Sequence, residues 1–142
     1  HYKDECVLFV DTKDNSVVSF LEENDVLPIP MPPQLREHIQ ICNERHKVYR
    51  DFLQSNFKDV DRILICDVRD VIFQDDPFKH ESTTQLEFFY EANRIGQCDW
   101  NSKHLRAIYD KTVVDGISNF LISCAGTVMG NRDGILTYLK TM

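Results

Sequence analysis

The chain has 142 residues, a size at which one hydrophobic core and one domain are expected. Apolar residues form 42% of it, which excludes wholesale disorder. With 16 Lys and Arg against 23 Asp and Glu, the net charge of −7 argues against a nucleic-acid partner held on a basic face. No stretch approaches the roughly 20 apolar residues that span a bilayer, so no membrane segment is expected in this sequence.

The sequence starts with His1 and carries no signal-peptide pattern, so we expect residues 1–142 to form a single domain, partial or minimal, of a longer protein. Five cysteines without a CxxC pair argue against a zinc cage. Two predictions remain for these cysteines. One is a disulfide between Cys98 and Cys124, and the favoured one is reduced, buried thiols.

Strands and helices alternate along the chain. Short apolar runs indicate strands, apolar residues at steps of three and four indicate helices, and closely spaced prolines indicate a loop. Asn15 is expected to cap the first helix and Asn131 the last. This alternation favours an α/β fold. In chain order we predict a strand at 6–11, a helix at 16–24, a strand at 26–30, a proline loop at 30–33, a helix at 35–55, strands at 62–66 and 86–91, a helix at 100–110, a strand at 120–124 and a helix from 132.

The most polar strand end is the one after residue 66. Asp67 and Asp70 directly follow a buried strand, and ligands of open α/β sheets bind beyond the carboxyl ends of strands. Two such carboxylates can converge on a hard cation such as Mn²⁺ or Mg²⁺, and Arg69 can add a contact to phosphate. The alternative is a solvated turn in which Arg69 pairs with one of the acids.

The segment 63–78 resembles nucleotide-diphospho-sugar transferases of the GT-A fold. Some members carry the form D-x-R-D-V-x-F-Q-x-D-P-F. Residues 45–53 (R-x-x-x-Y-x-x-F-L) and 123–130 (S-C-A-G-T-V-M-G) resemble two further segments of that family, in the expected order. The first match falls on Asp67, Arg69, Asp70, Val71, Phe73, Gln74, Asp76, Pro77 and Phe78.

This resemblance implies a GT-A-like (Rossmann-like) fold with a mostly parallel sheet flanked by helices, incomplete at both ends. It implies transfer of a sugar from a nucleotide-diphosphate donor to a hydroxyl acceptor on a glycan, a protein or a small molecule. Asp67 and Asp70 would coordinate Mn²⁺ or Mg²⁺ at the donor diphosphate. Arg69 stands where the usual D-x-D spacing places the second acid, so Asp70, which keeps its distance to Asp-Pro-Phe, is the better supported ligand. In a eukaryote, such enzymes often lie in the lumen of the secretory pathway, including the Golgi.

Three residues are candidates for the acceptor side. Glu91 could act as general base toward a hydroxyl if the enzyme inverts, although Glu87 and Glu91, four apart on one strand face, could simply be solvated. Trp100 and Asn101 could form an acceptor wall, since sugars stack on indole rings. A lone Trp is also commonly a packing residue.

Two further candidates lie on the donor side. Arg45 could reach the diphosphate, or pair with Glu44 or Asp51. Gly126 offers a close backbone approach, which a tight turn between strand and helix would also explain. His46, on the apolar stripe of the long helix, is predicted to be a core histidine.

Three other classes of protein are alternatives to the transferase. A haloacid-dehalogenase-type phosphatase needs a second Asp at the position of Arg69, so that pattern fails. A non-catalytic binding module with a glycosyltransferase-like fold, and an isolated structural fragment, are the remaining alternatives.

Overall fold

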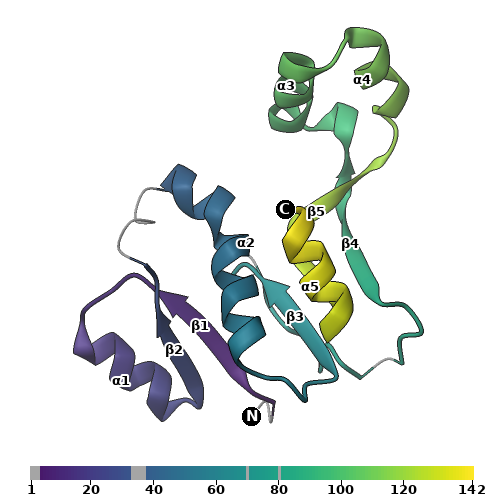
Figure 1. Cartoon of the computed structure of the whole chain (residues 1–142). Coiled ribbons are helices and arrows are strands. Elements are labelled where there is room, and N and C mark those ends of the chain that lie inside the picture. The colour runs from purple at the N-terminus through teal and green to yellow at the C-terminus, as the bar shows by residue number, and fades with distance from the viewer. Residues whose placement is uncertain (1–3, 33–37, 70, 80) are drawn as a thin grey trace. The chain divides into compact units, whose positions relative to one another are not determined.

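The computed structural model describes residues 4–32, 38–69, 71–79 and 81–142, with side chains in the long helix α2 described from residue 44 onward. The chain is a mixed α/β protein, as its sequence predicts (Figure 1). Its elements are β1 (Cys6–Val10), α1 (Asn15–Glu23), β2 (Val26–Pro30), α2 (His38–Ser55), β3 (Arg62–Cys66), β4 (Leu86–Arg94), the 3₁₀ helix η2 (Ile95–Gln97), α3 (Asp99–Ile108), α4 (Lys111–Ile117), β5 (Leu121–Asn131) and α5 (Arg132–Thr141).

The chain divides into two compact units. Unit 1 comprises His1–Asp59 and Leu136–Met142, and unit 2 comprises Val60–Ile135. No helix among the described residues has the length and apolar character needed to cross a membrane.

Unit 1 is built on the parallel pair β1 and β2, joined through α1. The register sets Cys6 opposite Val26 and Val10 opposite Pro30. Asp14, rather than the predicted Asn15, caps α1, because its carboxylate accepts the Ser16 N–H at 2.9 Å. The predicted strand at 26–30 is confirmed, and part of the predicted helix at 35–55 lies outside the described residues.

Aromatic rings join α2 to its neighbours in unit 1. The ring of Phe9 lies 4.8 Å from that of Tyr49 and 5.4 Å from that of Phe52, so β1 packs against α2. The His46 ring lies 6.0 Å from that of Tyr138, and the His46 side chain is buried. The prediction of a core histidine is therefore confirmed.

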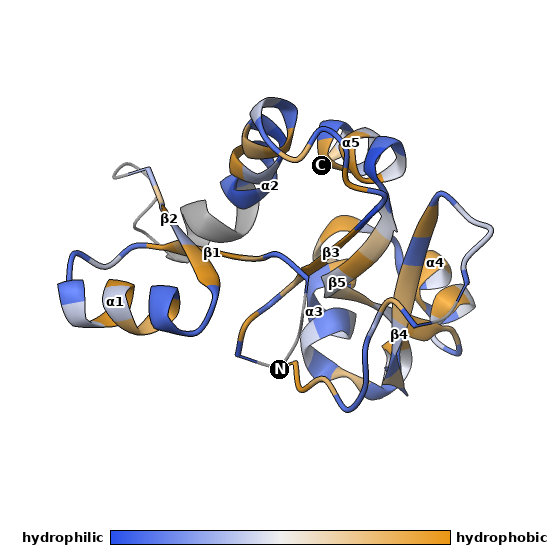
Figure 2. Ribbon diagram, turned by 90° about the horizontal axis from the view of Figure 1, so that it is seen from below, coloured by the Kyte–Doolittle hydropathy of each residue, from blue (hydrophilic) through white to orange (hydrophobic). Residues whose placement is uncertain are grey.

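Unit 2 is built on an antiparallel sheet of order β3–β5–β4. The expectation of a mostly parallel sheet is met by β1 and β2 and not by this sheet. Apolar runs mark strands without showing their direction, so the sequence could not distinguish the two. Figure 2 shows β1 mostly in the hydrophobic colour, whereas β4 carries both hydrophobic and hydrophilic segments.

Strand β5 is longer than the sequence predicts. The predicted strand ended at residue 124, with a glycine-containing turn after it, whereas β5 continues to Asn131. Gly130 lies in this extension because the Gln85 carbonyl approaches so closely that a Cβ would collide with it. The Asn131 N–H donates to the same carbonyl at 3.0 Å. The predicted cap of α5 is confirmed, since Asn131 Oδ1 accepts the Gly134 N–H at 2.8 Å.

The helical region between β4 and β5 also differs from the prediction. One helix was expected at 100–110, but α3 ends at Ile108 and a second helix, α4, follows. Tyr109 and Asp110 have extended backbones, which separates the two helices. The short α4 buries one side chain, that of Val114. A single buried residue gives no periodic apolar pattern, so the sequence did not reveal this helix.

Each unit has its own buried apolar side chains. Ile72 and Phe73, which follow β3 in the sequence, are 87% and 54% exposed, because β3 ends at Cys66. Among the described side chains, the buried apolar ones are Leu53 and Leu139 in unit 1, and Val114, Ile122, Val128, Met129 and Ile135 in unit 2.

Val114→Ala should lower the free energy of unfolding by about 2 kcal/mol, because it removes two buried methyl groups and leaves a cavity. Val113→Ala on the same helix should lower it by less than about 0.5 kcal/mol, since Val113 is half exposed. Both changes alter helix propensity equally, so urea unfolding followed by circular dichroism isolates burial. Equal losses in the two variants would contradict the packing of Val114.

Candidate functional site

Asp67 and Gly126, two predicted donor-side residues, lie together at the end of β3. The Asp67 N–H donates to the Gly126 carbonyl at 2.8 Å, which continues the β3–β5 pairing one step beyond Cys66 and Thr127. A Cβ on Gly126 would lie 2.5 Å from Asp67 Oδ2 and 2.9 Å from its Cγ. The carboxylate therefore rests against a backbone position where only glycine leaves room. The tight turn suggested for Gly126 is wrong, because this residue lies inside β5.

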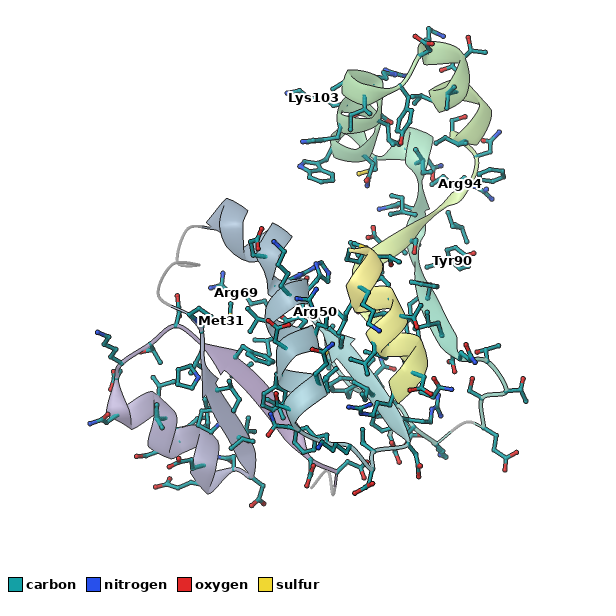
Figure 3. The ribbon with its side chains drawn as sticks, in the orientation of Figure 1. Met31, Arg50, Arg69, Tyr90, Arg94 and Lys103 are labelled. Atoms are coloured by element: carbon teal, nitrogen blue, oxygen red, sulfur yellow. The ribbon has the colours of Figure 1, made fainter. Side chains whose placement is uncertain are left out.

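Arg69 lies two residues after Asp67 in the sequence and is exposed to solvent (Figure 3). The ion pairs seen among the described residues do not involve Arg69. Asp70, the predicted second metal ligand, lies outside the described residues. Within the described part of the chain, no group of three or more His, Cys, Asp or Glu side chains could hold a metal ion. The half-buried Asp67 carboxylate is an oxygen donor of the kind that Mn²⁺ and Mg²⁺ prefer, so it fits the predicted cation.

Two of the predicted acceptor-side residues, Trp100 and Asn101, follow Cys98 in the first turn of α3, and the third, Glu91, acts on the Cys98 thiol only through its charge. Cys98 is the N-cap residue of α3, and its Sγ accepts a hydrogen bond from Asn101 Nδ2 at 3.3 Å. Hydrogen bonding from the Asn101 backbone and then from its side chain lowers the pKa of the Cys98 thiol below its ordinary value. Burial and the negative charge of Glu91 act in the opposite direction.

Trp100 is a surface aromatic rather than a packing residue. Its side chain is 67% exposed, and its ring lies 4.0 Å from that of His104 at an interplanar angle of 32°. His104 is held in place because its Nδ1 donates to the Trp100 carbonyl at 2.7 Å. One indole face is thus supported by the imidazole, an arrangement suited to stacking a further planar or apolar ring face.

Glu87 and Glu91 do not play equivalent parts, although they lie four apart on β4. Glu91 is exposed, as the solvated alternative predicted, but Glu87 is half-buried and pairs with Arg62 at 3.0 Å. The β4–β5 register is irregular between Phe88 and Tyr90 and again between Tyr90 and Arg94. Such bulges interrupt strict side-chain alternation, which a sequence pattern assumes.

The two groups of candidate residues lie on one sheet but at different places along it. Tyr90 pairs with Ser123, so Glu91 lies near the start of β5, whereas Gly126 lies further along that strand. At roughly 3.3 Å per residue, the separation along β5 is on the order of 10 Å. Tyr90 and Arg94 extend from β4 in this region (Figure 3). The donor-side and acceptor-side groups are therefore separate along the strand.

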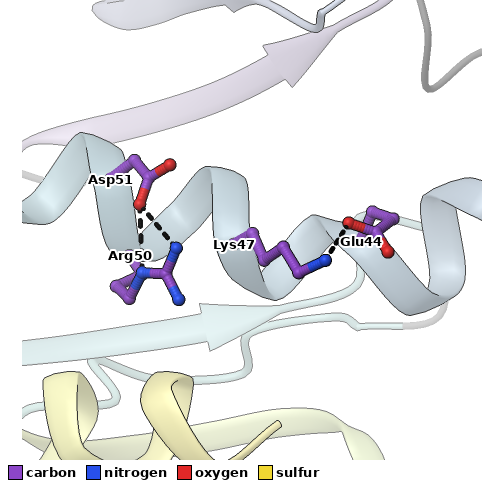
Figure 4. A network of polar contacts seen from close by, with 4 residues as sticks. All are labelled: Glu44, Lys47, Arg50 and Asp51. Atoms are coloured by element: carbon purple, nitrogen blue, oxygen red, sulfur yellow. Dashed lines mark hydrogen bonds and ion pairs between the residues drawn. The ribbon is translucent and has the colours of Figure 1, made fainter.

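Arg45 belongs to unit 1, on α2, and is half-buried. The carboxylates considered as its partners bind neighbouring residues (Figure 4). Glu44 pairs with Lys47 at 2.6 Å, and Asp51 pairs with Arg50 at 2.9 Å. These are surface ion pairs, each worth little to stability.

The cysteines that the structure describes are free thiols. Cys98 and Cys124 form no disulfide, in agreement with the favoured prediction of reduced thiols. They are not fully buried, however. Cys6 is exposed, and Cys66, Cys98 and Cys124 are half-buried. Sequence reasoning missed Cys98 as the centre of the acceptor-side group, because a thiol at a helix N-cap is recognisable only once the helix start is known.

Comparison of the chain with family models, with curated proteins and with solved structures gave no match.

The alkylation of Cys98 by iodoacetamide should show a pH midpoint below that of an ordinary thiol, because a lowered pKa populates the thiolate at lower pH. Asn101→Ala should move the midpoint up, since it removes the Nδ2 donor but keeps the backbone N–H. Glu91→Gln should lower the midpoint, since this change removes a negative charge that disfavours the Cys98 thiolate. Mass spectrometry of the Cys98 peptide measures both. A midpoint unaffected by Glu91→Gln would contradict the grouping of Glu91 with Cys98.

Proposed function

We propose that this chain is a GT-A-like glycosyltransferase domain that moves a sugar from a nucleotide-diphosphate donor to a hydroxyl acceptor. The observation that carries the proposal is the arrangement at the end of β3. There, the first acid of the D-x-R-D sequence lies against Gly126, which continues the same backbone pairing. An acid in this position, with an exposed arginine beside it, is suited to a diphosphate and its counter-cation.

On the donor side, Asp67 and Asp70 would hold Mn²⁺ or Mg²⁺. When bound, this cation neutralises the negative charge of the diphosphate leaving group. Arg69 is exposed and can contribute charge-assisted hydrogen bonds to phosphate oxygens. Gly126 leaves the space in which the Asp67 carboxylate lies. Arg45 lies on unit 1, and its assignment to the diphosphate stays a prediction from the sequence resemblance.

On the acceptor side, the exposed indole of Trp100 would stack against a sugar or an apolar ring face. Asn101 would contact the acceptor through Oδ1 or through the second hydrogen of Nδ2, because one Nδ2 hydrogen donates to Cys98. In an inverting transfer, Glu91 would take the proton of the acceptor hydroxyl. The hydroxyl oxygen would then bond to the anomeric carbon of the donor sugar, while the bond between that carbon and the diphosphate breaks. The exposure of Glu91 leaves the carboxylate accessible for this role.

The alternative is a non-catalytic binding module with a similar fold. Large exposed aromatic side chains on unit 2 favour it, because such surfaces commonly contact partners. Phe88, Tyr90 and Trp100 are 50%, 70% and 67% exposed. The two functions differ in nucleotide binding, which the module would lack.

Titration calorimetry with UDP and GDP, with and without Mn²⁺, tests the proposal on the full chain. We expect metal-dependent binding that Asp67→Asn and Asp70→Asn each weaken at least about tenfold, roughly 1.4 kcal/mol. Asp61→Asn is the matched control, because Asp61 is an exposed acid just before β3, at the opposite end from Asp67. A folded chain that binds neither nucleotide would reject the transferase and favour the binding module.

Gly126→Ala should weaken Mn²⁺-dependent nucleotide binding while costing at most about 1 kcal/mol of stability. The new Cβ would meet the mobile end of the Asp67 side chain, which can move away, but the carboxylate would then leave its place. Gly116→Ala, in α4, is the control. It has open space around it and should leave binding unchanged and raise stability by about 0.5–1 kcal/mol. Unaltered binding in Gly126→Ala would argue against Asp67 as a ligand.

A further inference from the structure

Arg62 begins β3 and links three parts of unit 2. Its Nη2 donates to Glu87 Oε1 on β4 at 3.0 Å, and its guanidinium carbon lies 5.7 Å from the centre of the Phe78 ring. The side chains of Arg62 and Glu87 are only 23% and 21% exposed. This is a partly buried ion pair with an aromatic contact, unlike the exposed pairs on α2.

The register explains how Arg62 reaches Glu87 although β5 separates their strands. Leu64 and Glu87 both pair with Met129, so these three residues share one face of the sheet. Arg62, two residues before Leu64, lies on that same face. Its long side chain therefore crosses the central strand diagonally, over a distance set by two strand spacings of about 4.8 Å each.

Phe78 is the last residue of the segment that resembles the transferase motif. Asp76 Oδ1 accepts the Phe78 N–H at 2.8 Å, and the Asp76 carbonyl accepts the Lys79 N–H at 3.2 Å. The Asp-Pro-Phe sequence thus forms a local turn that presents the half-buried Phe78 ring to Arg62. The Asp-Pro-Phe sequence therefore makes a structural contact with Arg62, the first residue of β3.

The motif segment is consequently anchored at both ends of one strand. The Cα atoms of Arg62 and Cys66 are about 13 Å apart along β3. At one end of the segment, just after Cys66, the Asp67 N–H donates to the Gly126 carbonyl. At the other end, the Phe78 ring contacts the guanidinium of Arg62 at the start of β3. Between these anchors, Ile72 and Phe73 are exposed.

We propose that Arg62 is a positioning residue that, with Glu87 and Phe78, holds the returning end of the motif segment on the sheet and so restricts where Arg69 can lie. Holding both ends of a segment removes conformational freedom that ligand binding would otherwise have to remove. The ligand part of this proposal rests on the proposed function, whereas the anchoring of the segment does not.

The chemistry requires arginine rather than a cation in general. A planar guanidinium can donate to a carboxylate from its edge and present its face to an aromatic ring. A lysine ammonium in the same place is a compact charge that can pair with Glu87 but cannot span both partners equally well. Arg62→Lys should therefore retain part of the effect that Arg62→Met removes.

Hydrogen exchange measured by mass spectrometry on the full chain tests the anchoring. Arg62→Met and Phe78→Leu should each raise exchange in residues 71–79 at least tenfold, while amides of β5 stay protected. Lys79→Met is the matched control, because it removes the exposed Lys79–Asp75 ion pair within the same region without touching Phe78. Unchanged exchange at 71–79 in a folded Arg62→Met or Phe78→Leu chain would overturn the proposal.

Calorimetry with UDP and Mn²⁺ on the same variants separates positioning from general stability. We expect at least tenfold weaker binding in Arg62→Met, an intermediate value in Arg62→Lys and no change in Lys79→Met. Faster exchange with unweakened binding would overturn the positioning role. If no variant, including the unaltered chain, binds nucleotide while exchange at 71–79 rises, the anchor is supported and the transferase function fails.

Discussion

Unit 2 depends on the pairing of β5 along both of its edges, with β3 on one side and β4 on the other. Buried backbone amides and carbonyls must find hydrogen-bond partners, so a central strand sets the position of both neighbours. One more hydrogen bond beyond the β3 ladder fixes Asp67 on Gly126. The buried Val128 and Met129 also lie in β5, so the core of unit 2 and the candidate donor site depend on the same strand.

Two glycines in β5 lower the stability of the strand but allow other groups to approach its backbone closely. Glycine weakens a strand, since it loses more backbone freedom on folding and offers no side chain to pack. Gly126 nevertheless admits the Asp67 carboxylate, and Gly130 admits the Gln85 carbonyl that leads into β4. A larger residue at either position would push apart groups that the sheet brings together. The proposed site thus depends on the absence of side chains as well as on their presence.

Charge pairs differ in value according to their surroundings. The Glu44–Lys47 pair on α2 is exposed and contributes little. Arg62 and Glu87 are mostly shielded from water, so loss of one partner would leave the other poorly solvated. This difference makes Arg62 a residue that can hold a segment in place rather than a surface cation.

The sequence by itself determined the mixed α/β class and the strands β2 and β3, because short apolar runs between polar residues have few other uses in a chain of this size. It also indicated His46 as a core residue from its place on the apolar stripe of α2. Only the tertiary structure decided that β5 runs on to Asn131, that its sheet is antiparallel, and that Glu87 pairs with Arg62 across it. Those features depend on strand direction, register and bulges, which arise from pairing between distant segments and leave no local pattern in the sequence.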